Sequence, residues 1–206
     1  MSSRQWVAAV ASLLFTMCAH TQWTAVHATE TRTETITTPA GLTQTNITTS
    51  EYFRSNDGSV LTVSTVRAPN GMFLQKVGQL YDAEAPAQYN LDYKKKTAEL
   101  IVRMDQPRPF ITNRSQYNPG LQHAKYEGLD CVLVPVMLNG RRIGTYWIDD
   151  KDDLVVEKDV TFPNSHVITK LSSITRGEKY SQSMFRVPSG FVIDASEAKT
   201  TPTSTR

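Results

Sequence analysis

The chain has 206 residues, 39% of them hydrophobic and 20% charged, with 22 Lys and Arg against 20 Asp and Glu. This length is enough for one domain with a hydrophobic core of its own. The near-neutral balance gives no reason to expect a nucleic acid or an anionic lipid as a partner, because either would favour an excess of positive charge.

The N-terminus has the form of a secretory signal peptide. Arg4 supplies a lone positive charge, and residues 6–19 form an apolar stretch without a charged residue. Val26-His27-Ala28 then offers small residues at the positions that a signal peptidase reads. We therefore expect a signal peptide over residues 1–28, cleavage near Ala28, and a periplasmic or secreted protein.

Two other interpretations of this segment are disfavoured. The apolar stretch is too short to cross a membrane, which takes about 20 residues, so no transmembrane span is expected in the mature chain. Lipid anchoring at Cys18 is also not expected, because Met17 occupies a position where a lipoprotein signal has a small residue.

A single β domain is expected over residues 29–194, followed by a polar, disordered tail over 195–206. No segment keeps a helical apolar pattern over three turns, so the prediction is an all-β fold with little helix outside the signal peptide. Turn residues separate the β-rich segments, which is typical of an antiparallel meander that forms a barrel or a sandwich. Besides a hairpin described below, the expected strands cover residues 33–38, 44–53, 60–66, 72–81, 88–93, 97–104, 154–162 and 167–174.

A long segment at residues 105–120 interrupts the meander. It contains three prolines, with Phe110 and Tyr117 among polar residues. A loop of this length is often functional, for example as a lid or a binding loop. The alternative is a strap that crosses the fold and fills one end of the barrel with its aromatic side chains. Both interpretations stay open.

Residues 131–149 are predicted to form one β-hairpin around Asn139-Gly140, a pair that tolerates the positive φ angles of a tight turn. Both faces of the hairpin are largely apolar, so we expect one face on the core and the other covered by a loop, a partner or a ligand. Pro135 has no N–H to donate, which predicts a sheet edge or a bulge there. A two-residue turn pairs Leu138 with Arg141, Val136 with Ile143, Leu133 with Tyr146 and Val132 with Trp147.

Residues suited to catalysis or metal binding are scarce. After residue 28 there are two histidines, His123 and His166, far apart in sequence and without the spacing of a metal site or of a nucleophile and its base. The acidic run 149–153 lacks the glycine and glutamate of a calcium loop, so a solvated turn is expected. The single cysteine after residue 28, Cys131, is expected to be a buried hydrophobe. No metal, cofactor or enzymatic activity is predicted.

Four motifs occur in a characteristic order between residues 81 and 193. They are EGLDC at 127–131, GTYWID at 144–149, LVVEK at 154–158 and SMFRVPSGF at 183–191. This order resembles the outer-membrane lipoprotein-sorting (LolA/LolB-like) superfamily and its secreted relatives. The resemblance implies a strongly curved antiparallel sheet, an open half-barrel whose concave face holds acyl chains or a partner's apolar segment. Lipoprotein carriers start with a helix after the signal peptide, whereas this chain starts in a Thr-rich strand.

We therefore expect a secreted, non-enzymatic protein that binds lipid, a lipoprotein or an apolar part of an envelope protein. Its candidate ligand contacts are Leu133, Tyr146 and Trp147, with Phe110 from the long loop, although plain core positions would suit the same residues. Two rival hypotheses are an envelope interaction or sensor domain that binds no lipid, and a small hydrolase whose histidine meets a serine and an acid in the fold.

Overall fold

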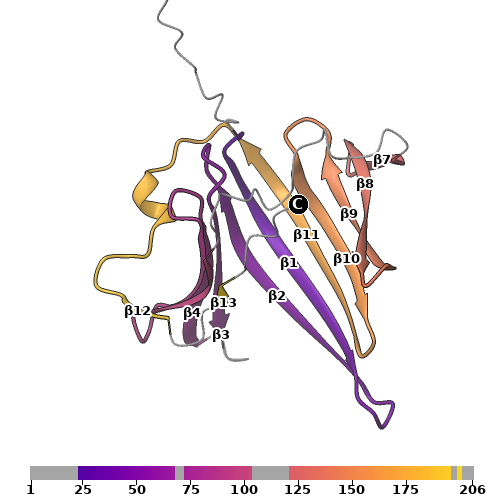
Figure 1. Cartoon of the computed structure of the whole chain (residues 1–206), viewed down its shortest axis with the longest axis horizontal. Coiled ribbons are helices and arrows are strands. Elements are labelled where there is room, and N and C mark those ends of the chain that lie inside the picture. Colours follow the sequence, from indigo (N-terminus) through magenta and orange to yellow (C-terminus); the bar gives the residue numbers. More distant parts are fainter. Residues whose placement is uncertain (1–22, 68–71, 104–120, 196–198, 201–206) are drawn as a thin grey trace, which may run out of the picture.

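The computed structural model is built almost wholly from β-strands (Figure 1). It describes residues 23–67, 72–103, 121–195 and 199–200. One 3₁₀ turn, η2 (Gln182–Phe185), is the exception among these residues. The strands are β1 (Val26–Thr37), β2 (Thr43–Arg54), β3 (Val60–Arg67), β4 (Phe73–Asp82), β5 (Ala87–Asp92), β6 (Thr97–Arg103), β7 (His123–Tyr126), β8 (Leu129–Leu138), β9 (Arg141–Asp149), β10 (Leu154–Phe162), β11 (Ser165–Arg176), β12 (Val192–Asp194) and β13 (Lys199–Thr200).

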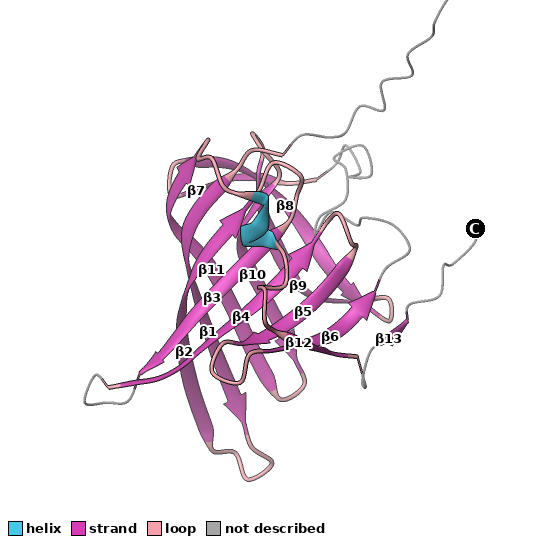
Figure 2. Cartoon of the chain, turned by 90° about the vertical axis from the view of Figure 1, so that its left-hand side faces the viewer, coloured by secondary structure: helices cyan, strands magenta, loops and turns pink. Residues whose placement is uncertain are grey.

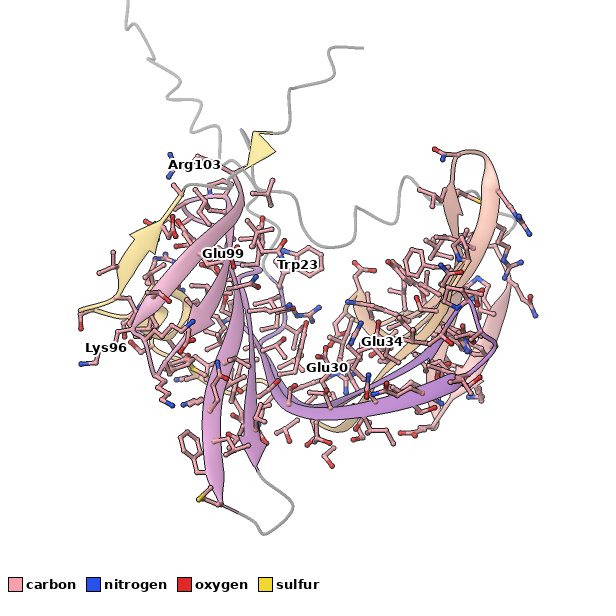
Figure 3. The ribbon with its side chains drawn as sticks, turned by 90° about the horizontal axis from the view of Figure 1, so that it is seen from below. Trp23, Glu30, Glu34, Lys96, Glu99 and Arg103 are labelled. Carbon is pink, nitrogen blue, oxygen red and sulfur yellow. The ribbon has the colours of Figure 1, made fainter. Side chains whose placement is uncertain are left out.

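All these strands belong to one 13-stranded sheet, and β1 lies in its middle. Strands β2 to β6 follow on one side of β1, and β11 back to β7 follow on the other. Neighbouring strands are antiparallel, except that β12 and β13 run parallel to β6. The sheet bends into a horseshoe with two arms (Figure 3). The predicted all-β, strongly curved half-barrel is therefore confirmed.

The Asn139-Gly140 hairpin forms as predicted, with positive φ at both turn residues (51° and 76°). Its register is correct only next to the turn, where Leu138 pairs with Arg141. A β-bulge between Val136 and Met137 then shifts the pairing by one residue, so the predicted pairs beyond it are wrong. In particular, Leu133 faces Trp147 instead of Tyr146. A bulge sets two residues against one, which sequence patterning alone does not reveal.

Pro135 lies one residue from this bulge, as its missing N–H predicted. It also lies at an edge, because β7 pairs with β8 only as far as Val132. The Leu133 N–H still donates to the Gln122 carbonyl (2.9 Å), and beyond it β8 is paired only with β9 among the described residues.

The first of two hydrophobic cores lies on the outer side of the arm formed by β3 to β6. The chain segment after β11 wraps over this face and carries η2 with it (Figure 2). Phe185 of η2 is completely buried, and Tyr180 and Phe191 pack against the same cluster. The sheet contributes Leu61, Leu80, Ala87, Tyr89, Leu91, Ala98 and Leu100. The C-terminal segment is therefore the second layer that this arm needs to bury its apolar face.

The second core joins the start of β1 to the other arm. Its buried members are Val26, Ala28, Cys131, Leu154, Val156 and Leu171. Cys131 is fully buried, as expected. Burial raises the pKa of its thiol to about 11, and the nearby carboxylates of Asp149, Asp130 and Asp150 act in the same direction. A thiol in this state is a poor nucleophile at neutral pH.

Residues 23–28 are part of the fold. The Trp23 N–H donates to the Asn56 carbonyl (2.9 Å), and its indole covers Gly58 so closely that a Cβ there would lie 2.8 Å from Nε1. Val26 and Ala28 are 0% and 1% exposed. Cleavage at Ala28 would remove all of these contacts.

The acidic run 149–153 is only partly the solvated turn that was predicted. The side chains of Asp149 and Asp152 are buried and paired with arginines from other strands. Arg176 donates to Asp152 (2.8 Å) and to Asp149, while Arg54 donates to the Asp152 carbonyl (3.2 Å). Burial alone would lower the pKa of Arg176, but its bonds to both carboxylates outweigh this effect and raise it.

In the part of the chain that the structure describes, no helix has the length and apolarity needed to cross a membrane.

The position of the mature N-terminus is a first prediction. Because Trp23 to Ala28 pack into the fold, we expect a processed protein whose N-terminus lies at or before Trp23. N-terminal sequencing and intact mass will locate it. A stable, folded protein that starts at Thr29 would contradict this expectation, since its core would lack Val26 and Ala28.

The buried ion network gives a second prediction. Asp152→Asn should lower the free energy of unfolding by about 3–5 kcal/mol, because it leaves two largely buried arginines short of negative charge. Asp130→Asn is the matched control, since Asp130 pairs with Lys125 at the surface and such a pair contributes about 1 kcal/mol or less. Denaturant unfolding measures both variants, and equal losses would argue against the network.

Candidate functional site

An open groove of about 580 Å³ lies on the face of β1 to β6 opposite the first core. Most of its side chains come from alternate positions of six neighbouring strands, and cross-strand pairing aligns them in rows. One row runs through Ser50, Ser64, Val77, Asp92 and Thr97, and the next through Thr62, Gln79, Asn90 and Glu99. Glu30 of β1 points into the hollow of the horseshoe (Figure 3). The groove therefore follows the concave side of the sheet.

Polar side chains dominate this groove. Thirteen of its sixteen lining residues are polar or charged, so the surface is built to hydrogen-bond. Some of these groups already pair across the sheet, as Ser50 and Ser64 do through their hydroxyls (2.6 Å) and Asn90 and Glu99 through an amide and a carboxylate (3.2 Å). A hydroxyl, amide or carboxylate can make more than one hydrogen bond, so the row still offers donors and acceptors to a ligand.

A smaller pocket of about 130 Å³ adjoins the groove and shares Glu30, Thr62 and Gln79 with it. Its other walls are more apolar. They come from both arms and comprise Tyr52, Val60, Leu80, Tyr81, Gln88, Val155, Lys158, Thr169 and Leu171. This pocket is the place where the concave face offers apolar surface beside the groove.

Two opposite charges, Glu30 and Lys158, line this pocket, and Glu30 also lines the groove. Burial raises the pKa of Glu30, and the positive charges of Lys158 and Arg32 offset part of that rise. Burial lowers the pKa of Lys158, and Glu30 opposes that shift in turn. Burial also raises the pKa of Tyr52 to about 12, so its hydroxyl keeps its proton at neutral pH. The pocket thus combines a carboxylate, an amine and a phenol in one place.

The predicted ligand contacts lie elsewhere. Phe110 is outside the described residues. Leu133 and Trp147 are cross-strand partners, whereas Tyr146 pairs with Val134 and with Lys158. All three are half-buried, and none lines the groove or the adjoining pocket. Trp147 packs against the second core and lies 6.0 Å from the Tyr126 ring.

The residues of the groove were not predicted as a site. Their signal is a polar alternation within strands, for example Thr62 and Ser64 in β3 or Thr48 and Ser50 in β2. Such alternation normally marks a solvent-exposed face. It does not show that the face will be concave, because curvature depends on how the strands pair across the whole sheet.

The histidines do not assemble a hydrolase site among the described residues. His166 bonds to Asp159 (2.8 Å) and His27 to Glu51 (2.6 Å), but within that part of the chain no serine hydroxyl bonds to either ring. No group of three or more potential metal-ligating side chains occurs there either.

No protein-family model and no curated protein sequence matches this chain. Several solved structures are similar to it. An uncharacterized conserved protein from Thermus thermophilus is 8% identical, with a TM-score of 0.49 over 84% of this chain and 90% of that one. PNGF-II is 9% identical, with a TM-score of 0.46 over 86% of this chain, which spans only 32% of PNGF-II.

A LolA superfamily protein from Nitrosomonas europaea is also similar, at 5% identity and a TM-score of 0.38 over 79% of this chain and 90% of that one. The superfamily that the sequence motifs resemble is thus represented among the similar solved structures. At these identities and scores, what this chain binds has to be inferred from its own residues.

The buried Glu30 gives a third prediction. A carboxyl whose pKa is raised in the folded state binds more protons than in the unfolded state, so folding loses stability as pH rises through that pKa. The Glu30→Gln variant lacks this contribution to the pH dependence of stability, because a glutamine side chain does not titrate. Thermal unfolding from about pH 4 to pH 7 should show the wild type losing stability relative to this variant. A constant difference across this range would contradict the raised pKa.

Proposed function

We propose that this protein is a non-enzymatic binding protein that holds an elongated, hydrogen-bonding ligand in the groove of its half-barrel. The observation that carries the proposal is the row of polar side chains across six strands, set in an open groove of about 580 Å³. Small-molecule sites span about 300–1,000 Å³, so the groove has the capacity of a ligand site.

The polar lining determines which part of a ligand the groove suits. Ligand sites usually have mostly apolar walls and a few polar groups, but here most of the lining side chains carry a polar group. A bare acyl chain would leave these hydroxyls, amides and carboxylates without partners, at a cost in free energy. A headgroup, a peptide segment or a sugar would instead satisfy them.

A binding role also fits the chemistry of the lining. The groove-lining residues include neither histidine nor cysteine, the side chains that most often act as base or nucleophile near neutral pH. The groove instead offers neutral hydrogen-bonding groups with charges at its borders. These features suit the reversible binding of a ligand that is not chemically converted.

An acyl chain, as in a lipid or lipoprotein, is a second candidate for the concave face. The adjoining pocket supports it, because Tyr52, Val60 and Leu171 give it an apolar wall. At about 130 Å³ it suits a short apolar group more than a whole chain. An amphiphile with its headgroup in the groove would use both spaces. We place this binding protein in the periplasm or outside the cell, in line with its signal-like N-terminus.

Filling the groove tests the proposal. Ser64→Trp places an indole in the middle of the polar row, whereas Thr65→Trp places one at the neighbouring, exposed position on the opposite face. Native mass spectrometry of protein purified from its own cell envelope should show a bound ligand in the wild type and in Thr65→Trp. The bound fraction should fall at least about tenfold in Ser64→Trp, as expected when one good contact region is lost.

Titration with a fluorescent fatty acid separates the two candidates. Tight binding that both tryptophan variants retain would favour an acyl site away from the polar row. A wild type that carries no ligand and binds no fatty acid would refute both candidates.

A further inference from the structure

The near-neutral chain separates its charges between the two ends of the sheet. Because neighbouring strands are antiparallel, the turns after β1, β3, β5, β8 and β10 all lie at the same end. Figure 1 shows the β1–β2 and β10–β11 turns at its lower edge. We call this end the basic rim and define it as residues 36–44, 66–67, 72–74, 91–98, 137–142 and 161–166.

The basic rim contains six Lys and Arg residues and a single acidic one, Asp92. Asp92 accepts hydrogen bonds from the backbone N–H groups of Lys94 and Lys95, both at 2.9 Å, and so fixes the turn that carries the lysines. The side chains of Lys94, Lys95, Lys96, Arg141 and Arg142 are all exposed. This end of the molecule is therefore positively charged.

The same end also carries most of the exposed apolar surface. Of the eleven large hydrophobic side chains that are exposed among the described residues, eight belong to the basic rim. Phe73 is 55% exposed and Leu42 is 70% exposed. The eight are Leu42, Val66, Met72, Phe73, Leu74, Met137, Leu138 and Phe162. Scattered exposed hydrophobics are ordinary, but this concentration at one end indicates an interaction surface.

Four turns of the described residues at the opposite end are mainly acidic, and Arg176 and Arg186 pair with acids in two of them. With the strand ends beside them, these turns cover residues 53–61, 81–88, 125–130 and 148–155. These ranges hold nine acidic residues and three basic ones. None of the exposed large hydrophobics of the described residues lies in them. The basic rim is thus the end with the stronger attraction to a negative surface.

We propose that the basic rim docks onto the surface of an anionic lipid bilayer. Lysine and arginine side chains are attracted to anionic headgroups, and apolar side chains on adjacent turns enter the headgroup boundary. A nucleic acid would make no use of the exposed Phe, Met and Leu side chains. The acidic opposite end would face away, so the protein would dock in one orientation. This proposal does not depend on what the groove binds.

Co-sedimentation with vesicles tests the docking surface. The full chain is mixed with phosphatidylcholine vesicles, with or without phosphatidylglycerol. We expect binding only to the anionic vesicles, and weaker binding at high salt. The triple variant Lys94→Gln, Lys96→Gln, Arg141→Gln leaves the groove lining unchanged and should weaken binding at least about tenfold, because each basic side chain near an anionic surface adds to the affinity. Phe73→Ser with Met72→Ser should weaken it as well.

The matched control removes the same charge elsewhere. Lys125→Gln, Lys151→Gln, Lys179→Gln changes three exposed lysines away from the basic rim, and it should bind like the wild type. If both triple variants lost vesicle binding equally, binding would depend on the net charge of the protein and not on the basic rim, and the proposal would be overturned. So would a wild type that ignores anionic vesicles, or one that self-associates through the rim and loses that association in the rim variants. Ligand content of the groove, measured in parallel, keeps the two proposals separate.

Discussion

The pairing of strand β1 along both of its edges is the constraint on which the rest of the structure depends. β1 pairs with β2 at twelve positions and with β11 at ten, so this one strand joins the two arms of the horseshoe. Its residues also lie at the meeting point of the site and the second core: Val26 and Ala28 are buried at one end, and Glu30 and Arg32 line the groove further along. A change of one residue in the register of β1 would move each of these side chains to the other face.

That alternation explains how one sheet serves two environments. In β3 to β6, one set of side chains packs under the C-terminal segment around Phe185, and the other set forms the polar groove. The apolar cover is therefore outside the curve and the hydrogen-bonding surface is inside it. The arm formed by β3 to β6 therefore buries its outer hydrophobic face under its own chain, without a ligand.

Local chemistry made much of the fold predictable. Asn139-Gly140 fixed a hairpin, Pro135 marked an edge and a bulge, and Cys131 was buried as its apolar neighbours indicated. The register beyond the bulge was missed, because one extra residue leaves no pattern in the sequence. The buried Asp152 was missed for another reason: its partner Arg54 lies almost a hundred positions earlier, and only the folded sheet brings them together.

The groove and the charge separation were unpredictable from sequence for a related reason. Thr62 and Asn90 are ordinary polar strand residues until six strands align them in one concave surface. Likewise, Lys94 and Arg141 are far apart in the sequence, and only the folded sheet brings them to the same end. Averaged over the chain, acidic and basic residues cancel, and only the order of the strands shows that they belong to different ends.

The central place of β1 also has a consequence for how the chain can fold. Val26 pairs with Arg176, a residue 150 positions later, while its other partner, Arg54, follows after a single hairpin. During synthesis the first arm can assemble early, but one edge of β1 stays open until β11 has been made. An open strand edge invites pairing with other chains, and contacts of such long range form slowly. Until β11 has been made, a first arm that had already assembled would expose β1 as an unpaired strand edge.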